Sequence, residues 1–340
     1  MKRMFAPFLC LTGLALVLAN ACKAPDPTGE DSTGGDGDTG IIDPTTSDSD
    51  SSTTESSTEI TDPTADSATT DVEETTDTED ENPIQQDCDT SLELIVRDFN
   101  SDHPDMEEAF AGWNEIGCGM VKDTLFIGTD GARTPVFQAN NGTGKRTITA
   151  GTISCLAWDP SSNPTAPEVV ITSEDSFNQW FSTIDGVNMA ITHTLELAPV
   201  DPNDANSNYY FDSKELDGAR FFPADGLGFN EQTQGHNYHF TSEAHVRFTY
   251  NSGDKFTFSG DDDMWIFVNN KIALDLGGLH GPLSATIDFD AQASALGITA
   301  GMVYNMDIFH AERHTSDSNY RIETSIGCFE KVEVPDVIIR

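Results

Sequence analysis

The stretch Lys255-Phe-Thr-Phe-Ser-Gly-Asp-Asp-Asp-Met-Trp-Ile-Phe-Val268 decides the class of fold. Its first five residues alternate polar and apolar side chains, which is the period of a half-buried β-strand. Its last five residues are an unbroken apolar run of strand length, and Asn269-Asn270 follows as a tight turn. The stretch therefore predicts two strands joined by a turn that holds Asp261, Asp262 and Asp263.

Strand patterns continue on the C-terminal side of this stretch, in short runs rich in Thr, Val, Ile and Phe. These runs predict an all-β fold, an antiparallel β-sandwich with long inserted loops and a few short helices. The further predicted strands are 271–276, 285–289, 303–309 and 320–326. Short helices are predicted at 103–110 and 173–181, with Ser173 as the N-cap of the second.

The charge balance excludes one class of partner. The chain has 340 residues, with 58 Asp and Glu against 17 Lys and Arg and a formal net charge of −41. Affinity for nucleic acid depends on Lys and Arg neutralising phosphates, so a nucleic-acid binder is excluded. The same balance argues against direct binding to an anionic membrane surface.

Residues 1–22 have the pattern of an export signal. Lys2 and Arg3 precede the apolar run Leu9–Ala19, which is too short for a permanent membrane span. Two interpretations of the end of this segment stay open. Ala19-Asn20-Ala21 suits an ordinary signal peptidase, whereas Ala21-Cys22 resembles a bacterial lipobox in which Cys22 is lipidated. We expect an exported protein, either an outer-membrane lipoprotein at the cell surface or a secreted one.

Residues 23–87 have the composition of a disordered linker. Residues 24–87 contain 20 acidic residues and no Lys, Arg or aromatic residue. Such a segment buries too little apolar surface to offset the entropy of ordering it. We expect a spacer that holds a domain away from a surface, and a plain solubility tail is the alternative.

Residues 88–330 are the predicted folded domain, and 331–340 are a C-terminal tail. Four cysteines lie in the domain, and an even set in an exported protein indicates disulfides. Three pairings are possible. We favour Cys88–Cys328, which joins the domain ends, together with Cys118–Cys155.

The three adjacent aspartates form the main candidate metal site. Neighbouring carboxylates repel one another, and a turn tolerates them when a cation offsets the cost. Oxygen-rich clusters suit Ca²⁺, although the spacing is not that of an EF-hand. A solvated acidic turn is the alternative. A zinc site at His310 and His314 is disfavoured, because residues four apart on a strand lie roughly 13 Å from each other.

An ordered series of motifs resembles the fibro-slime domain over nearly all of 92–327. This domain occurs in bacterial surface and slime-associated proteins and in secreted prespore-inducing factors of social amoebae. The C-terminal half resembles the anthrax protective-antigen-type β-sandwich with which yeast flocculins and adhesins bind glycans. The motifs are Ile95–Phe99, His103-Pro-Asp105, Phe177-x-x-Trp180, Gly186-Val-Asn188, Phe221-Phe-Pro223, Gly228-Phe229, His236–Thr241, Phe256–Asn269, Asp275–His280, Phe309–His314 and Ser318–Thr324.

The resemblance implies a Ca²⁺ site. In the related lectins two adjacent aspartates, joined by a cis peptide bond, hold a Ca²⁺ that also contacts sugar hydroxyls, and the pair aligns with Asp261 and Asp262. Asp263 stands where a glycine usually follows, which is a departure from the family pattern. The other candidate metal ligands are Asp263, Asp317 and Asn319, and the candidate ligand contacts are Trp265, His280, Glu312 and His314.

We therefore expect a non-enzymatic, Ca²⁺-dependent carbohydrate-binding or adhesion module. Its partner would be an extracellular glycan or matrix polysaccharide, and any membrane contact would run through the N-terminal lipid anchor. Two alternatives stay open. One is a secreted polysaccharide hydrolase that uses a metal at His310 and His314 or a carboxylate pair. The other is a structural matrix or signalling protein that binds protein partners.

Overall fold

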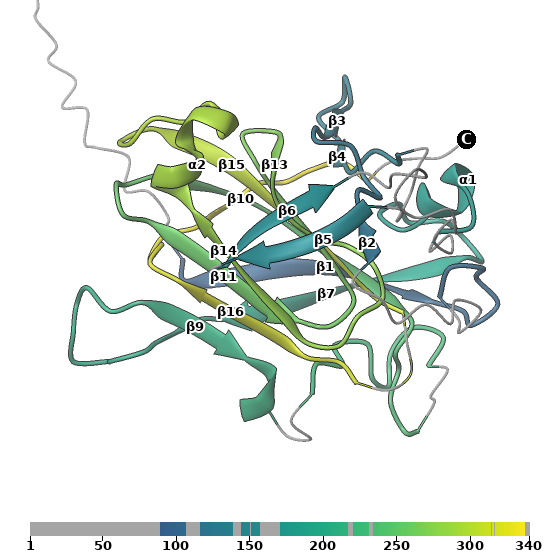
Figure 1. Ribbon diagram of the computed structural model, residues 1–340. Coiled ribbons are helices and arrows are strands. Elements are labelled where there is room, and N and C mark those ends of the chain that lie inside the picture. The colour runs from purple at the N-terminus through teal and green to yellow at the C-terminus, as the bar shows by residue number, and fades with distance from the viewer. Residues whose placement is uncertain are drawn as a thin grey trace, which may run out of the picture. The chain divides into compact units, whose positions relative to one another are not determined.

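Two antiparallel β-sheets form the frame of the domain in the computed structural model (Figure 1). The structure describes residues 89–106, 116–138, 144–149, 151–156, 171–216, 220–230, 234–313, 315 and 317–336. The predicted export signal at 1–22, the predicted linker at 23–87 and Cys88 lie outside these ranges. In the described ranges, no helix has the length and apolar character needed to cross a membrane.

The larger sheet has seven strands, and six of them follow one path. Their order is β13 (Lys271–Leu276), β12 (Asp263–Val268), β15 (Val303–Glu312), β10 (Phe240–Thr249), β1 (Ser91–Phe99) and β7 (Asn188–Glu196). The seventh, β17 (Glu330–Lys331), pairs with β10.

The second sheet has five strands, and smaller elements complete the fold. The order in the second sheet is β14 (Leu283–Asp288), β11 (Lys255–Gly260), β16 (Tyr320–Thr324), β9 (Tyr209–Asp212) and β8 (Ala198–Pro199). The remaining elements are β2 (Ile116–Cys118), β5 (Gly144–Thr149), β6 (Thr152–Leu156), the hairpin β3 (Phe126–Ile127) and β4 (Arg133–Thr134), helices α1 (Glu174–Phe177) and α2 (Phe289–Leu296), and the 3₁₀ helix Ser213–Glu215.

The main core lies between the two sheets. Alternate residues of the larger sheet, such as Val246 and Ile308, meet Phe258 and Ile322 of the second sheet in one buried cluster. In Figure 1, β11, β14 and β16 lie across β1 and β7. Two sheets that enclose a shared apolar core form a β-sandwich, and the predicted fold class is confirmed.

The outer face of the larger sheet is also buried. Trp265 and Phe309 point away from the main core and pack against Phe177, Trp180 and Phe181 from the segment around α1. A strand covered on both faces has no polar alternation, which explains the unbroken apolar run of β12. The expectation that Trp265 contacts a ligand is corrected here, because its side chain has no exposed surface.

Most of the predicted elements are present. The strands β11, β12, β13, β14, β15 and β16 lie at the predicted positions, and Asn269 and Asn270 form the turn with positive φ angles of 51° and 65°. Ser173 caps α1 through a capping box, as predicted. Residues 103–106 form turns instead of the start of a helix. Helix α2 was not predicted, although Asp288 caps its N-terminus.

One disulfide prediction is confirmed. Cys118 and Cys155 are bonded, with their Cα atoms 5.8 Å apart. Cys328 is also disulfide-bonded. Its predicted partner, Cys88, lies outside the described residues, so that pairing stays a prediction.

A row of buried charges crosses the outer face of the larger sheet. His245 Nδ1 lies 2.8 Å from Asp307 Oδ1, and Arg133 also binds Asp307 through two nitrogens, each at 2.6 Å. Arg97 donates to Glu243 at 2.9 Å in the same row. Burial alone lowers the pKa of His245, but the hydrogen bonds to Asp307 and Glu243 outweigh burial and raise it to about 9.

The raised pKa of His245 gives a pH-dependent stability. Between pH 6.5 and about 9 the folded state binds a proton that the unfolded state releases, so stability falls as the pH rises through this range. His245→Gln removes this part of the pH dependence. Urea unfolding of both proteins between pH 6 and 9.5 measures it, with His236→Gln as the control that keeps the wild-type slope. Equal slopes for wild type and His245→Gln would contradict the assignment.

Candidate functional site

The three aspartates lie in a buried turn between β11 and β12. Their exposed fractions are 4% for Asp261, 3% for Asp262 and 0% for Asp263. Asp262 adopts a positive φ of 58°, and the peptide bond between Asp261 and Asp262 is trans, since the described residues contain no cis peptide bond. The cis linkage implied by the resemblance is therefore wrong. Positive φ at Asp262 makes the sharp turn without a cis bond.

Each aspartate accepts hydrogen bonds from a different part of the chain. Asp261 accepts from the backbone N–H and the side-chain amide of Asn319. Asp262 accepts from the backbone N–H of Arg313 at 2.9 Å. The turn is thus held to the segment that follows β15, which contains the candidate ligand Asn319.

Asp263 forms a buried ion pair. Its Oδ2 lies 2.5 Å from Arg313 Nε, and neither side chain has exposed surface. Asp263 Oδ1 accepts from Gly278 N at 2.6 Å. Asp263 is therefore the counter-ion of Arg313, and this use leaves it poorly suited to a metal. The predicted metal role of Asp263 gives way to a structural one.

Glu312, the last residue of β15, adds a fourth carboxylate. It is 1% exposed, and its carboxyl lies against the carboxyl of Asp262 and the side chain of Ser318. Burial raises the pKa of Glu312 well above its ordinary value, and the charges of Asp262 and Asp261 raise it further. Burial also raises the pKa of Asp262, to about 7, against hydrogen bonding from Arg313. Three carboxylates therefore share a buried region that disfavours three negative charges.

His280 lies next to this turn. Its backbone N–H is 3.4 Å from Asp262 Oδ1. Its ring nitrogens lie 2.7 Å from the carbonyl oxygen of Leu276 and 2.9 Å from that of Gly281. These contacts fix the ring within its own loop, so His280 shapes the turn and its ring nitrogens do not face a ligand.

An aromatic and polar surface adjoins the carboxylates. The rings of Phe222 and His236 stack, with centroids 4.0 Å apart and an angle of 11° between planes, and Tyr238 packs edge-on against Phe222 at 4.8 Å. His236 Nδ1 lies 2.8 Å from Asp225. We call Phe222, Asp225, His236 and the nearby ion pair of Arg220 and Asp317 the ring surface.

The ring surface is joined directly to the loop that binds the acidic turn. Phe221 N donates to the carbonyl oxygen of Ser318 at 2.9 Å, and Ser318 Oγ donates back to Phe221 O. Glu312 and Asp317 both raise the pKa of Tyr238, in addition to the larger effect of burial. The sequence between positions 220 and 238 carries no periodic signal that separates the residues of this surface from those of the core.

The remaining predicted site residues are Asp317, Asn319, His310 and His314. Asn319 binds Asp261, whereas Asp317 lies at the surface and pairs with Arg220 at 2.6 Å. His310 is buried, and burial lowers its pKa to about 3, with a further contribution from His280. His314 lies outside the described residues.

The carboxylates near the turn have the ligand atoms that Ca²⁺ prefers, but their side chains are not grouped around one point. Asp261, Asp262 and Glu312 offer only oxygen atoms, and the Glu312 carboxyl is buried beside Asp262. In the described part of the chain, no three His, Cys, Asp or Glu side chains are grouped as metal ligands. Ca²⁺ binding would therefore require a rearrangement of these side chains.

A comparison with known protein families matches one part of this chain. Residues 205–334 match the PA14 domain. This range contains the acidic turn, Glu312 and the whole ring surface. The antiparallel sandwich and the matched range agree with the predicted protective-antigen-type architecture.

Individual relatives come from Dictyostelium discoideum. Protein psiC is 39% identical over 170 residues, which cover 47% of this chain and 31% of that protein. Protein psiJ is 33% identical over 257 residues, covering 70% of this chain and 31% of that protein. Protein psiR is 32% identical over 222 residues, covering 61% and 21% respectively. The chain spans about a third or less of the length of these relatives, and the predicted likeness to proteins of social amoebae is confirmed at this level.

The buried carboxylates predict a second pH effect, measured in the presence of a chelator. Because the pKa values of Asp262 and Glu312 are raised in the folded state, stability falls as the pH rises from about 4 through about 7 and beyond. Glu312→Gln keeps the shape and removes one charge, so its stability falls less steeply and exceeds that of wild type at pH 8. The matched control Glu323→Gln changes an ion-paired carboxylate at the surface and keeps the wild-type slope. A variant Glu312→Gln that is less stable at every pH, with an unchanged slope, would contradict this account.

Proposed function

We propose that this chain is a non-enzymatic carbohydrate-binding and adhesion module that acts outside the cell. The observation that carries the proposal is the juxtaposition, within the PA14-matching range, of the carboxylates of Asp261, Asp262 and Glu312 with the ring surface. Stacked rings flanked by carboxylate and guanidinium groups suit a sugar, which offers an apolar face and many hydroxyls.

Ca²⁺ is the proposed cofactor. Asp261, Asp262 and Glu312 would supply its ligands, and Asn319 would add its side-chain oxygen. A divalent cation offsets the repulsion that raises the pKa values of these groups. In the described conformation the carboxylates are 1–4% exposed, so the ion would order the loop from 315 to 319 more than contact sugar directly.

The sugar would bind at the ring surface. Arg220 and Asp317 are 39% and 47% exposed and can donate to and accept from hydroxyl groups, while Phe222 and His236 offer ring faces and edges. The proposed partner is an extracellular glycan or matrix polysaccharide. The narrower assignment to fibro-slime proteins, export, and lipidation at Cys22 belong to the same proposal and rest on the sequence.

Ca²⁺ is expected to raise the melting temperature, with a dissociation constant of about 10⁻⁴–10⁻³ M, as in other extracellular Ca²⁺ modules. Asp261→Ala abolishes this stabilisation and Glu312→Gln weakens it, because each removes a ligand. Thermal melts with Ca²⁺, with Mg²⁺ and with chelator measure the effect. Asp290→Asn is the control, since its carboxylate lies near Tyr250 and Ser252. Full stabilisation of Asp261→Ala would remove the site assignment.

Glycan binding is expected on an array of extracellular polysaccharides and oligosaccharides. Phe222→Ala and His236→Ala each lower binding about five- to thirtyfold, since one lost stacking contact is worth ~1–2 kcal/mol. Met302→Ala serves as the control, because Met302 is exposed and precedes β15 at the end opposite Glu312.

Other array outcomes would replace the proposal. Silence on the array, together with concentration-dependent assembly, favours a matrix protein that binds protein. Polysaccharide turnover that is lost in His310→Ala favours a hydrolase.

A further inference from the structure

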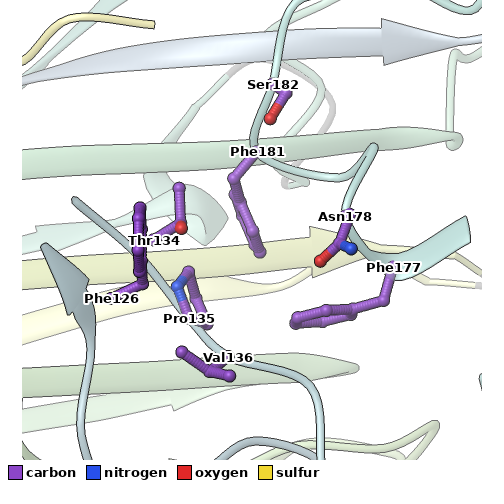
Figure 2. Close-up of a pocket in the computed structure, with 8 residues that line it drawn as sticks. All are labelled: Phe126, Thr134, Pro135, Val136, Phe177, Asn178, Phe181 and Ser182. Atoms are coloured by element: carbon purple, nitrogen blue, oxygen red, sulfur yellow. The ribbon is translucent and has the colours of Figure 1, made fainter. Parts of the chain in front are cut away.

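An apolar pocket lies away from the acidic turn, between the β3–β4 hairpin and the segment of α1. Its volume is about 280 Å³. Figure 2 shows the rings of Phe177 and Phe181 pointing from one wall toward Pro135 and Val136 on the other. Phe126, at the rim, is 52% exposed. The lining residues are Phe126, Thr134, Pro135, Val136, Phe177, Asn178, Phe181 and Ser182.

The end of the described chain is fixed beside this pocket. Asp336 Oδ1 accepts from Arg97 at 2.6 Å and from the backbone N–H of Thr183 at 3.2 Å. Thr183 directly follows Ser182, which lines the pocket. The hydrogen bond from Thr183 therefore places Asp336 next to one wall.

A second contact lies at the opposite wall. A Cβ atom built on Gly131 would lie 3.8 Å from Pro335 Cδ. Gly131 belongs to the turn between β3 and β4, the hairpin that supplies Phe126 and Thr134 to the pocket. Pro335 thus lies near the hairpin that forms one wall of the pocket, and Asp336 binds Thr183, which adjoins the other wall.

The three residues that follow Asp336 in the sequence are apolar, like most of the pocket lining. Residues 337–340 are Val-Ile-Ile-Arg, and they lie outside the described residues. Three residues reach about 10 Å, at roughly 3.3–3.6 Å each, so the distance from Asp336 into the neighbouring pocket is within their span. Branched aliphatic side chains gain free energy when they leave water for an apolar, aromatic-lined cavity.

We propose that Val337, Ile338 and Ile339 of the same chain occupy this pocket. The C-terminal segment is then a strap: β17 adds it to the larger sheet, Asp336 fixes it over Arg97, and the three aliphatic residues hold the β3–β4 hairpin to the segment of α1. Arg340 would lie at the pocket mouth or in solvent. The proposal concerns another part of the domain than the ring surface and does not depend on glycan or Ca²⁺ binding.

Methyl NMR and hydrogen exchange on the full chain test the strap. We expect nuclear Overhauser effects between the δ1 methyl groups of Ile338 or Ile339 and the ring protons of Phe177 or Phe181. Replacement of Val337, Ile338 and Ile339 by Ser raises amide exchange of the hairpin and of residues 174–183 by about tenfold or more, because their local opening is no longer opposed. Arg340→Ala, the matched control at the neighbouring position, leaves exchange unchanged.

Three results would overturn the proposal. The first is the absence of these Overhauser effects in wild type. The second is unchanged exchange in the triple Ser variant. The third is a set of Overhauser effects that vanishes on dilution as dimers dissociate in light scattering, because the occupant would then be the tail of a second copy. If the triple variant does not fold, Asp336→Asn is measured in its place. This variant weakens the contact with Arg97 and Thr183 and keeps the apolar residues, and it must raise exchange in the same two segments.

Discussion

The buried ion pair between Asp263 and Arg313 is the interaction on which the arrangement of this domain depends. Removing two charges from water costs several kcal/mol for each ion, and only close pairing with further hydrogen bonds recovers it. Arg313 Nε binds Asp263, and its guanidinium lies 4.8 Å from the centre of the Trp180 ring. Arg313 also donates to the carbonyl oxygen of Asp105, whose carboxylate accepts from Trp180 Nε1 at 3.0 Å. One residue thus joins the acidic turn of the sandwich to the layer that covers its outer face.

This pairing determines what the rest of the acidic turn can do. Arg313 carries one positive charge, which pairs with Asp263 and also lowers the pKa of Asp262. Backbone and amide N–H groups donate to Asp261 and Asp262, while the Glu312 carboxyl lies against Asp262 and Ser318, and no cation is among the groups that shift its pKa. The region therefore favours a proton on one of these carboxylates. Under the proposal made above, a cation would take the place of that proton and stabilise the loop joined to the ring surface.

Which features of the fold and of the site the sequence predicts depends on how far apart in the sequence the interacting residues lie. The strands from Lys255 to Thr324 depend on local periodicity and turn residues such as Asn269 and Asn270, and these were found. The apolar run of β12 is evident in the sequence. The layer that covers its outer face is not, because Trp180 and Trp265 lie 85 positions apart in the sequence. The acidic turn was located correctly, yet its trans linkage and the capture of Asp263 by Arg313 depend on a contact 50 residues away. The burial of Glu312 beside Asp262 likewise has no local signal, since an isolated Glu at a strand end is ordinarily solvated.

The covering layer also explains where binding surfaces remain. In a plain antiparallel sandwich the outer faces of both sheets are polar and available. Here Trp265, Phe267 and Phe309 make the outer face of the larger sheet apolar, and the segment around α1 buries them. Apart from the outer face of the second sheet, whose alternate residues are partly exposed, this leaves the edge of the covering layer and the loops at the strand ends. The ring surface lies in the second of these places, and the pocket between the β3–β4 hairpin and α1 lies in the first. The Arg97, His245 and Asp307 row lies on this covered face, where burial already keeps water from these charges and strengthens their pairing.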